Sequence, residues 1–78
     1  MAEQYTVANK SNVTIWWKDG GWYSGELIAG DVRTVDSNHD ADVTMFGKNQ
    51  SGDTEWGRVW IPLDKTLEVY GNKNWLLK

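Results

Sequence analysis

The chain alternates short runs of apolar and aromatic residues with short polar turns, and within each run the pattern has a period of two. Val13, Ile15 and Trp17 fall on one face of their run, and Trp16 falls on the other. Such alternation is typical of β-strands with one buried face. The predicted strands cover residues 3–8, 13–18, 22–28, 32–35, 42–47, 55–63, 66–70 and 75–77.

Turn residues separate these runs. Asp19-Gly20-Gly21 predicts a tight hairpin, because glycine adopts the backbone angles of primed turns without steric cost. Gly25 in the middle of a run indicates a bulge or a close approach of the backbone, and Pro62 marks a strand end or a sheet edge. We therefore expect an all-β fold: one small antiparallel β-sandwich or small barrel of seven to eight short strands over residues 1–78, with essentially no helix.

Extending the alternation along the chain assigns the tryptophans to faces. Trp17 is expected in the core and Trp16 on the outside. In the run 55–63, Trp56 and Trp60 fall opposite Val59, and we expect both to point outward. Trp22 stays unassigned, since the predicted bulge at Gly25 switches the alternation within its run. Trp16, Trp56 and Trp60 would then form one exposed aromatic surface if their strands share a sheet.

Exposed aromatic surface usually marks a binding site, because an indole offers an apolar face and one N–H donor at its edge. Two alternatives stay open: the tryptophans fill the core, or they form an interface between copies of the chain. The candidate ligand-binding residues are Trp16, Trp22, Trp56 and Trp60 together with Asp19, Glu26 and Arg58. Further hydrogen-bonding side chains nearby in the sequence are Asn49, Gln50, Asp53 and Glu55.

Composition narrows the function classes. The 78 residues contain six tryptophans and no cysteine, which excludes disulfides and thiolate metal sites. A formal charge of −3 argues against a nucleic-acid binder. No apolar run approaches the roughly 18 residues of a membrane span, and the first residues lack signal-peptide features. We expect a soluble protein, either cytoplasmic or secreted without a classical signal.

The loop 36–42 is a weak candidate for metal binding or catalysis. Asp36, Asn38, Asp40 and Asp42 alternate as calcium ligands do in an EF-hand loop, but the positions of its turn glycine and closing glutamate are not matched. A solvated turn is the favoured interpretation and a calcium site the alternative. His39 is the only histidine, and no nucleophile or phosphate-binding motif accompanies it, so we expect no enzyme and no cofactor.

The first half of the chain resembles two families of small β-sandwich proteins, the aegerolysins and the thaumatin-like proteins. The resemblance rests on Val7, Asn9, Thr14, Ile15, Leu27, Gly30, Thr34 and Val35. This chain is shorter than either family and lacks the disulfides of the thaumatin-like proteins. The resemblance implies the sandwich fold and a role at carbohydrate or lipid surfaces, and it carries over no functional residue.

These observations favour a carbohydrate-binding module or small lectin for neutral sugars, non-enzymatic and multivalent through homo-oligomerisation. Oligomerisation would raise the avidity of single sites that bind sugars weakly. Two other functions would also use exposed aromatic residues. The first is a membrane- or lipid-binding β domain of a toxin-like assembly, and the second is a structural protein whose aromatic residues contact copies of itself. Because acidic residues outnumber basic ones, anionic membranes and anionic glycans are the less favoured partners.

Overall fold

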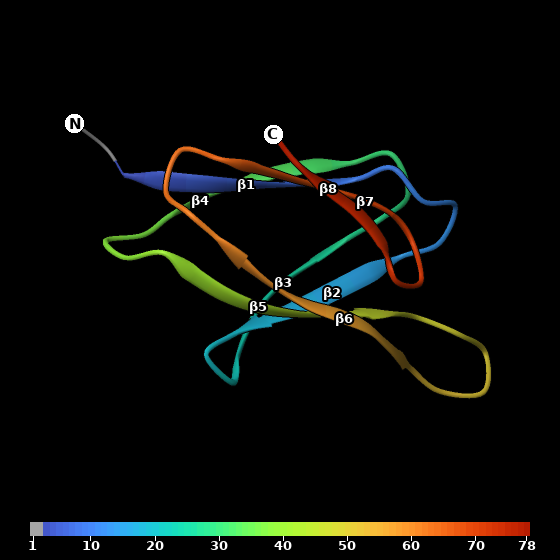
Figure 1. Cartoon of the computed structure of the whole chain (residues 1–78). Helices are drawn as coiled ribbons and strands as arrows, with labels where there is room; N and C mark the ends of the chain where they lie inside the picture. The colour runs from blue at the N-terminus through green and yellow to red at the C-terminus, as the bar shows by residue number, and fades with distance from the viewer. Residues whose placement is uncertain (1–2) are drawn as a thin grey trace.

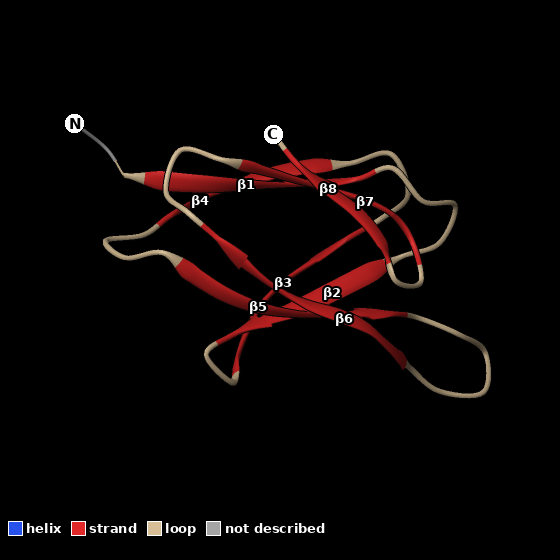
Figure 2. Ribbon diagram, in the orientation of Figure 1, coloured by secondary structure: helices blue, strands red, loops and turns tan. Residues whose placement is uncertain are grey.

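The computed structural model of the chain describes residues 3–78, and over that range it contains strands and loops but no helix (Figure 2). Every predicted strand is present, with bounds that differ from the prediction by two residues or fewer. The strands are β1 (Gln4–Asn9), β2 (Ile15–Asp19), β3 (Trp22–Leu27), β4 (Val32–Asp36), β5 (Ala41–Gly47), β6 (Thr54–Ile61), β7 (Thr66–Gly71) and β8 (Asn74–Leu77).

The strands form two four-stranded sheets that pack face to face (Figure 1). One sheet has the order β4-β1-β7-β8 and the other the order β3-β2-β5-β6. All neighbouring pairs are antiparallel except β1 and β7, which run parallel. The all-β sandwich expected from the sequence is confirmed. Met1 and Ala2, which the predicted domain includes, lie outside the described residues.

The core lies between the sheets and includes Trp17, as the alternation of its strand predicts. Tyr5 and Trp17 meet across the two sheets, where the Trp17 Nε1–H donates to the Tyr5 hydroxyl at 3.3 Å. The other fully buried apolar side chains are Val7, Ile15, Leu27, Ala41, Val43, Met45, Ile61, Leu67 and Val69. Within the described residues no helix is long and apolar enough to span a bilayer.

Two bulges interrupt the β3-β2-β5-β6 sheet. The first lies in β3, where Trp17 pairs with Gly25 but Lys18 pairs with Tyr23, so that Ser24 is an extra residue. This confirms the bulge predicted at Gly25. The second lies in β6 and was not predicted. Met45 pairs with Gly57 but Phe46 pairs with Glu55, so that Trp56 is an extra residue.

The bulge in β6 overturns the outward assignment of Trp56. Because the alternation shifts there, Trp56 turns inward and is 8% exposed, while Arg58 and Trp60 keep their outward positions. The Trp56 ring packs directly over Gly47, where any Cβ would overlap it. Trp56 is therefore a core residue and leaves the set of candidate ligand-binding residues.

Candidate ligand-binding site

The outer face of the β3-β2-β5-β6 sheet carries most of the candidate residues. Trp16 pairs with Phe46 of β5 and Trp60 pairs with Asp42 of β5. Because Phe46 and Asp42 are an even number of residues apart, Trp16 and Trp60 project from the same face of one sheet. The strand register arranges the side chains of this outer face in three successive rows across the sheet. The first row is Glu26, Trp16, Phe46 and Glu55, and the second is Tyr23, Lys18, Thr44 and Arg58. The third row is Asp42 and Trp60.

Trp16 of β2 is held on three sides. Its ring stacks on Phe46 of β5, with centroids 4.2 Å apart and planes 11° from parallel. The Trp16 Nε1–H donates a hydrogen bond of 2.6 Å to a carboxylate oxygen of Asp53 in the β5–β6 loop. The ammonium of Lys18 lies 5.8 Å from the Trp16 ring centroid and 5.6 Å from that of Phe46, within the range of a cation–π contact. These contacts fix the orientation of the indole.

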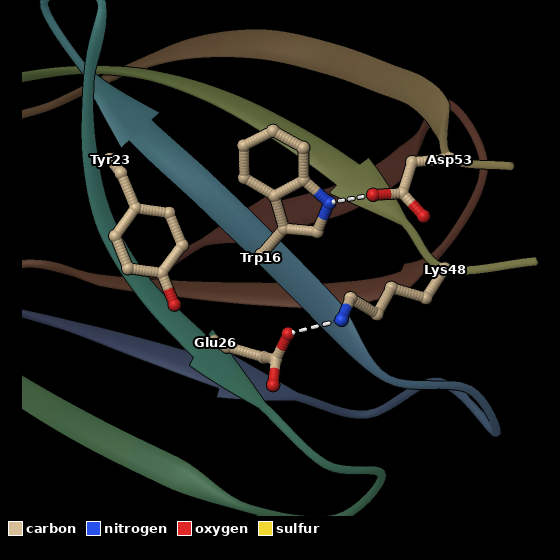
Figure 3. Close-up of a pocket in the computed structure, with 5 residues that line it drawn as sticks. All are labelled: Trp16, Tyr23, Glu26, Lys48 and Asp53. Carbon is tan, nitrogen blue, oxygen red and sulfur yellow. Dashed lines mark hydrogen bonds and ion pairs between the residues drawn. The ribbon is translucent and has the colours of Figure 1, made fainter.

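A shallow depression of about 220 Å³ opens beside Trp16 (Figure 3). It is lined by Trp16, Tyr23, Glu26, Lys48 and Asp53. Because the strand order is β3-β2-β5, the β3 residues Tyr23 and Glu26 lie on the side of the indole opposite Phe46. The ring of Tyr23 is 6.1 Å from that of Trp16 and tilted by 33°. One aromatic wall therefore faces a cavity whose rim is polar.

The polar rim consists of two carboxylates and one ammonium. Lys48 Nζ forms an ion pair of 2.7 Å with Glu26 Oε1, and about half of each side chain is exposed. The hydrogen bond and the charge of Glu26 raise the pKa of Lys48, and Asp53 and Tyr23 add smaller contributions. Lys48 therefore carries its positive charge at all physiological pH values, and the rim offers both donors and acceptors.

Arg58 and Trp60 lie at the other end of the same face. Arg58 contacts Asp42 in a bidentate pair, with Nε and Nη2 donating at 2.9 and 2.6 Å. The hydrogen bond from Arg58 lowers the pKa of the Asp42 carboxyl. Trp60 is 58% exposed, and its Nε1–H donates to Asp40 at 3.2 Å. The structure thus places Trp16, Glu26, Arg58 and Trp60 on one face of one sheet, an arrangement that the sequence left open, and only Trp16 and Glu26 line the depression.

Asp19 and Trp22 lie at the β2–β3 turn and not in the depression. The Asp19 carboxylate accepts a hydrogen bond of 3.0 Å from the backbone N–H of Asp42, which ties the hairpin to β5. Trp22 follows Gly20 and Gly21, both with positive φ, and is 80% exposed. Asp19 is therefore a structural acceptor, and Trp22 is an exposed aromatic side chain at the turn.

Three residues of the site were missed from the sequence. Phe46 could have been found, because the alternation of Val43 and Met45 puts it on the outer face. Tyr23 was hidden by the bulge at Gly25, which obscured the faces of its strand. Lys48 follows β5 in the loop, and its pairing with Glu26 depends on the order of strands, which alternation does not reveal. Of the other predicted hydrogen-bonding residues, Asp53 joins the site, whereas Asn49 donates to Thr54 within its loop.

The loop 36–42 does not assemble a metal site within the described residues. Asp42 is engaged by Arg58, and Asp40 accepts from the backbone N–H of Leu63 as well as from Trp60. Among residues 3–78, no three acidic or histidine side chains converge in a way that could hold a metal ion. His39 Nδ1 is exposed and hydrogen-bonds the backbone carbonyl of Asp40 at 2.7 Å.

Comparisons with protein-family models, with curated proteins and with solved structures found no match to this chain. The function of the site therefore has to be inferred from its own geometry.

Proposed function

We propose that this domain is a non-enzymatic carbohydrate-binding module that takes neutral sugars in the depression beside Trp16. The observation that carries the proposal is an indole held by Phe46 and Asp53, with a polar-rimmed cavity along its other side. Because its partners already fix the ring, binding costs little side-chain entropy.

The chemistry of the depression matches that of a sugar ring. The C–H side of a pyranose is apolar and packs against an aromatic face, while its hydroxyls need donors and acceptors at the edge. Glu26 uses one carboxylate oxygen for Lys48, and Asp53 uses one for Trp16. Among the interactions within residues 3–78, the second oxygen of each carboxylate is not used, so both can accept hydrogen bonds from hydroxyls. Lys48 and Tyr23 supply donors.

The charge of the site favours a neutral ligand over an anionic one. Two carboxylates and one ammonium line the depression, and the chain as a whole carries a formal charge of −3. An anionic glycan would be repelled by both the local and the overall charge.

A glycan array followed by titration calorimetry tests this proposal. We expect binding to at least one neutral sugar, and a loss of about tenfold or more in affinity in Trp16→Ala, equivalent to about 1.4 kcal/mol or more. Trp22→Ala is the matched control, because Trp22 is exposed and does not line the depression. Circular dichroism and thermal melting would establish that both variants are folded. Binding that is unchanged in folded Trp16→Ala would contradict the proposal, as would an array without any neutral ligand.

A second candidate function, binding to the surface of a neutral membrane, is favoured by Trp22 alone. The β2–β3 hairpin projects from the sandwich (Figure 1). Trp22 is the first residue of β3 after the turn, and its side chain is 80% exposed. Exposed tryptophans at such positions sit at the headgroup level of a bilayer. Co-sedimentation with phosphatidylcholine vesicles distinguishes the two functions: membrane binding requires Trp22 and not Trp16, whereas sugar binding requires Trp16 and not Trp22.

A further inference from the structure

The outer face of the β3-β2-β5-β6 sheet presents a second indole, that of Trp60, whose N–H donates to a loop aspartate as that of Trp16 does. Trp60 pairs with Asp42 on the outer face, while its neighbour Ile61 points into the core. Asp40 holds the edge of the Trp60 ring: one carboxylate oxygen accepts from the indole N–H and the other from the backbone N–H of Leu63. Each outer tryptophan thus has its N–H fixed by a loop aspartate, which leaves ring surface available for a ligand.

The two indoles are separated by a polar path. Trp16 and Trp60 are separated by two strand spacings across the sheet and by four residues along the strand direction. Their Cα atoms are therefore roughly 16 Å apart. The residue midway between them is Thr44, whose side chain is short. Lys18 flanks Thr44 on β2, and Arg58, paired with Asp42, flanks it on β6. The diagonal across the sheet therefore runs from one aromatic ring over hydrogen-bonding groups to the next.

We propose that Trp16 and Trp60 are two subsites for one extended, neutral glycan chain that crosses the sheet along this diagonal. This inference rests on the proposed function and adds the length and form of the ligand. A disaccharide is too short to reach both rings, whereas a longer linear chain spans them and places its middle units over Thr44. The protein offers two apolar indole faces with polar groups between them. A glycan chain that presents C–H faces and hydroxyls in alternation matches this arrangement.

Joining the two contacts in one ligand makes the second contact intramolecular, which raises affinity without any new kind of interaction. Affinity should therefore depend on chain length in a stepwise manner. Chains that reach only the depression beside Trp16 bind through one subsite, and chains long enough to reach Trp60 bind through two.

Titration calorimetry with three linear neutral series tests the inference: cellobiose to cellohexaose, mannobiose to mannohexaose, and maltose to maltohexaose. In a series that binds, we expect affinity to rise about tenfold or more between the disaccharide and the longest chain. Trp60→Ala should abolish this rise and leave the disaccharide affinity unchanged, because Trp60 is exposed and does not line the depression. Trp16→Ala should weaken every length, and Trp22→Ala should alter none.

The outcomes separate the two proposals. Affinity that is the same for all lengths, or a rise with length that persists in folded Trp60→Ala, would overturn the two-subsite inference and leave the carbohydrate-binding function standing. Failure of all three series to bind at any length would also overturn the two-subsite inference, whereas the carbohydrate-binding function is overturned only if the glycan array contains no neutral ligand.

Discussion

The buried polar residue Asn9 holds the point where the chain crosses from one sheet to the other. Its side chain is fully buried at the end of β1 and is satisfied on both sides. The amide Nδ2 donates to the carbonyls of Val13 and Leu27, at 2.8 and 3.1 Å, and Oδ1 accepts from the N–H and hydroxyl of Ser11. One side chain thus ties β1 to β3 and to the turn before β2.

We predict that Asn9→Asp destabilises the domain by about 2 to 4 kcal/mol. The substitution keeps the shape and the acceptor but removes both donors and places a charge against two carbonyl oxygens. Urea unfolding at neutral pH measures the loss, and Asn12→Asp, an exposed change in the same turn, is the matched control. Equal unfolding midpoints for the two variants would show that the buried amide of Asn9 does not contribute more to the free energy of unfolding than an exposed amide does.

Tyr5 makes the stability of the domain sensitive to alkaline pH. Burial raises the pKa of its hydroxyl above the ordinary value of 10.0, so the folded state retains a proton that the unfolded chain has lost. Stability is therefore constant with respect to this group below about pH 10 and falls as the pH rises further, by up to about 1.4 kcal/mol per pH unit.

Tyr5→Phe should remove this part of the alkaline dependence. At pH 7 the variant should be less stable by about 1 kcal/mol, since Trp17 loses its hydrogen-bond acceptor. Glu68 also raises the pKa of Tyr70, so the comparison of Tyr5→Phe with the wild type isolates the buried group. Urea unfolding between pH 8 and about pH 11 gives the slopes. Parallel curves for the two proteins would refute the assignment.

At the scale of strands, three tryptophans pack over three glycines. The ring of Trp17 lies over Gly25 on the neighbouring strand, and that of Trp56 over Gly47. Trp75 of β8 lies over Gly57, across the gap between the sheets. In each case a side chain on the glycine would enter the space of the ring. The glycines in β3, β5 and β6 therefore create room for large aromatic rings in a small core.

We predict that Gly47→Ala costs about 1 to 3 kcal/mol through steric conflict with Trp56. In a Trp56→Ala background the same change should cost far less, because the ring is gone, and the difference is the coupling measured by a double-mutant cycle. Gly71→Ala is the control, since Gly71 lies in β7 with open space at its Cβ position and no positive φ. Additive effects of the Gly47 and Trp56 changes would contradict the close packing.

The elements of the fold were predictable because each strand carries its own alternation and each turn its own glycine, asparagine or aspartate. The faces were predictable only where a strand is uninterrupted, as in the run containing Ile15, Trp16 and Trp17. The bulge in β6 reversed Trp56, because a bulge reflects packing against a partner strand as well as local sequence. For the same reason the contacts of Trp16 with Phe46 and Asp53 depend on strand order, which single-sequence patterns do not contain.

At the scale of the whole molecule, the sandwich has two open sides, and each is closed by a side chain from an edge strand. On one side the guanidinium of Arg33 in β4 reaches over Gly25 of β3. On the other, Trp75 of β8 covers Gly57 of β6, and the backbone N–H of Lys73 donates to the carbonyl of Trp56 at 3.0 Å. Trp75 is half-buried whereas Arg33 is exposed, so we expect the second closure to contribute more to holding the sheets together.

We predict that Trp75→Ala destabilises the domain by about 2 to 4 kcal/mol, because it removes a half-buried ring and exposes the core between β6 and β8 to water. Leu76→Ala is the matched control, since Leu76 is the next residue of β8, points away from the core and is 49% exposed. Its loss should be within about 0.5 kcal/mol. Thermal and urea unfolding of both variants measure the difference. A Trp75→Ala variant as stable as Leu76→Ala would mean that the sheets are held by the central strands alone. The proposed sugar-binding face lies on the opposite surface of the β3-β2-β5-β6 sheet, and we expect it to keep any affinity for sugar in a Trp75→Ala protein that remains folded.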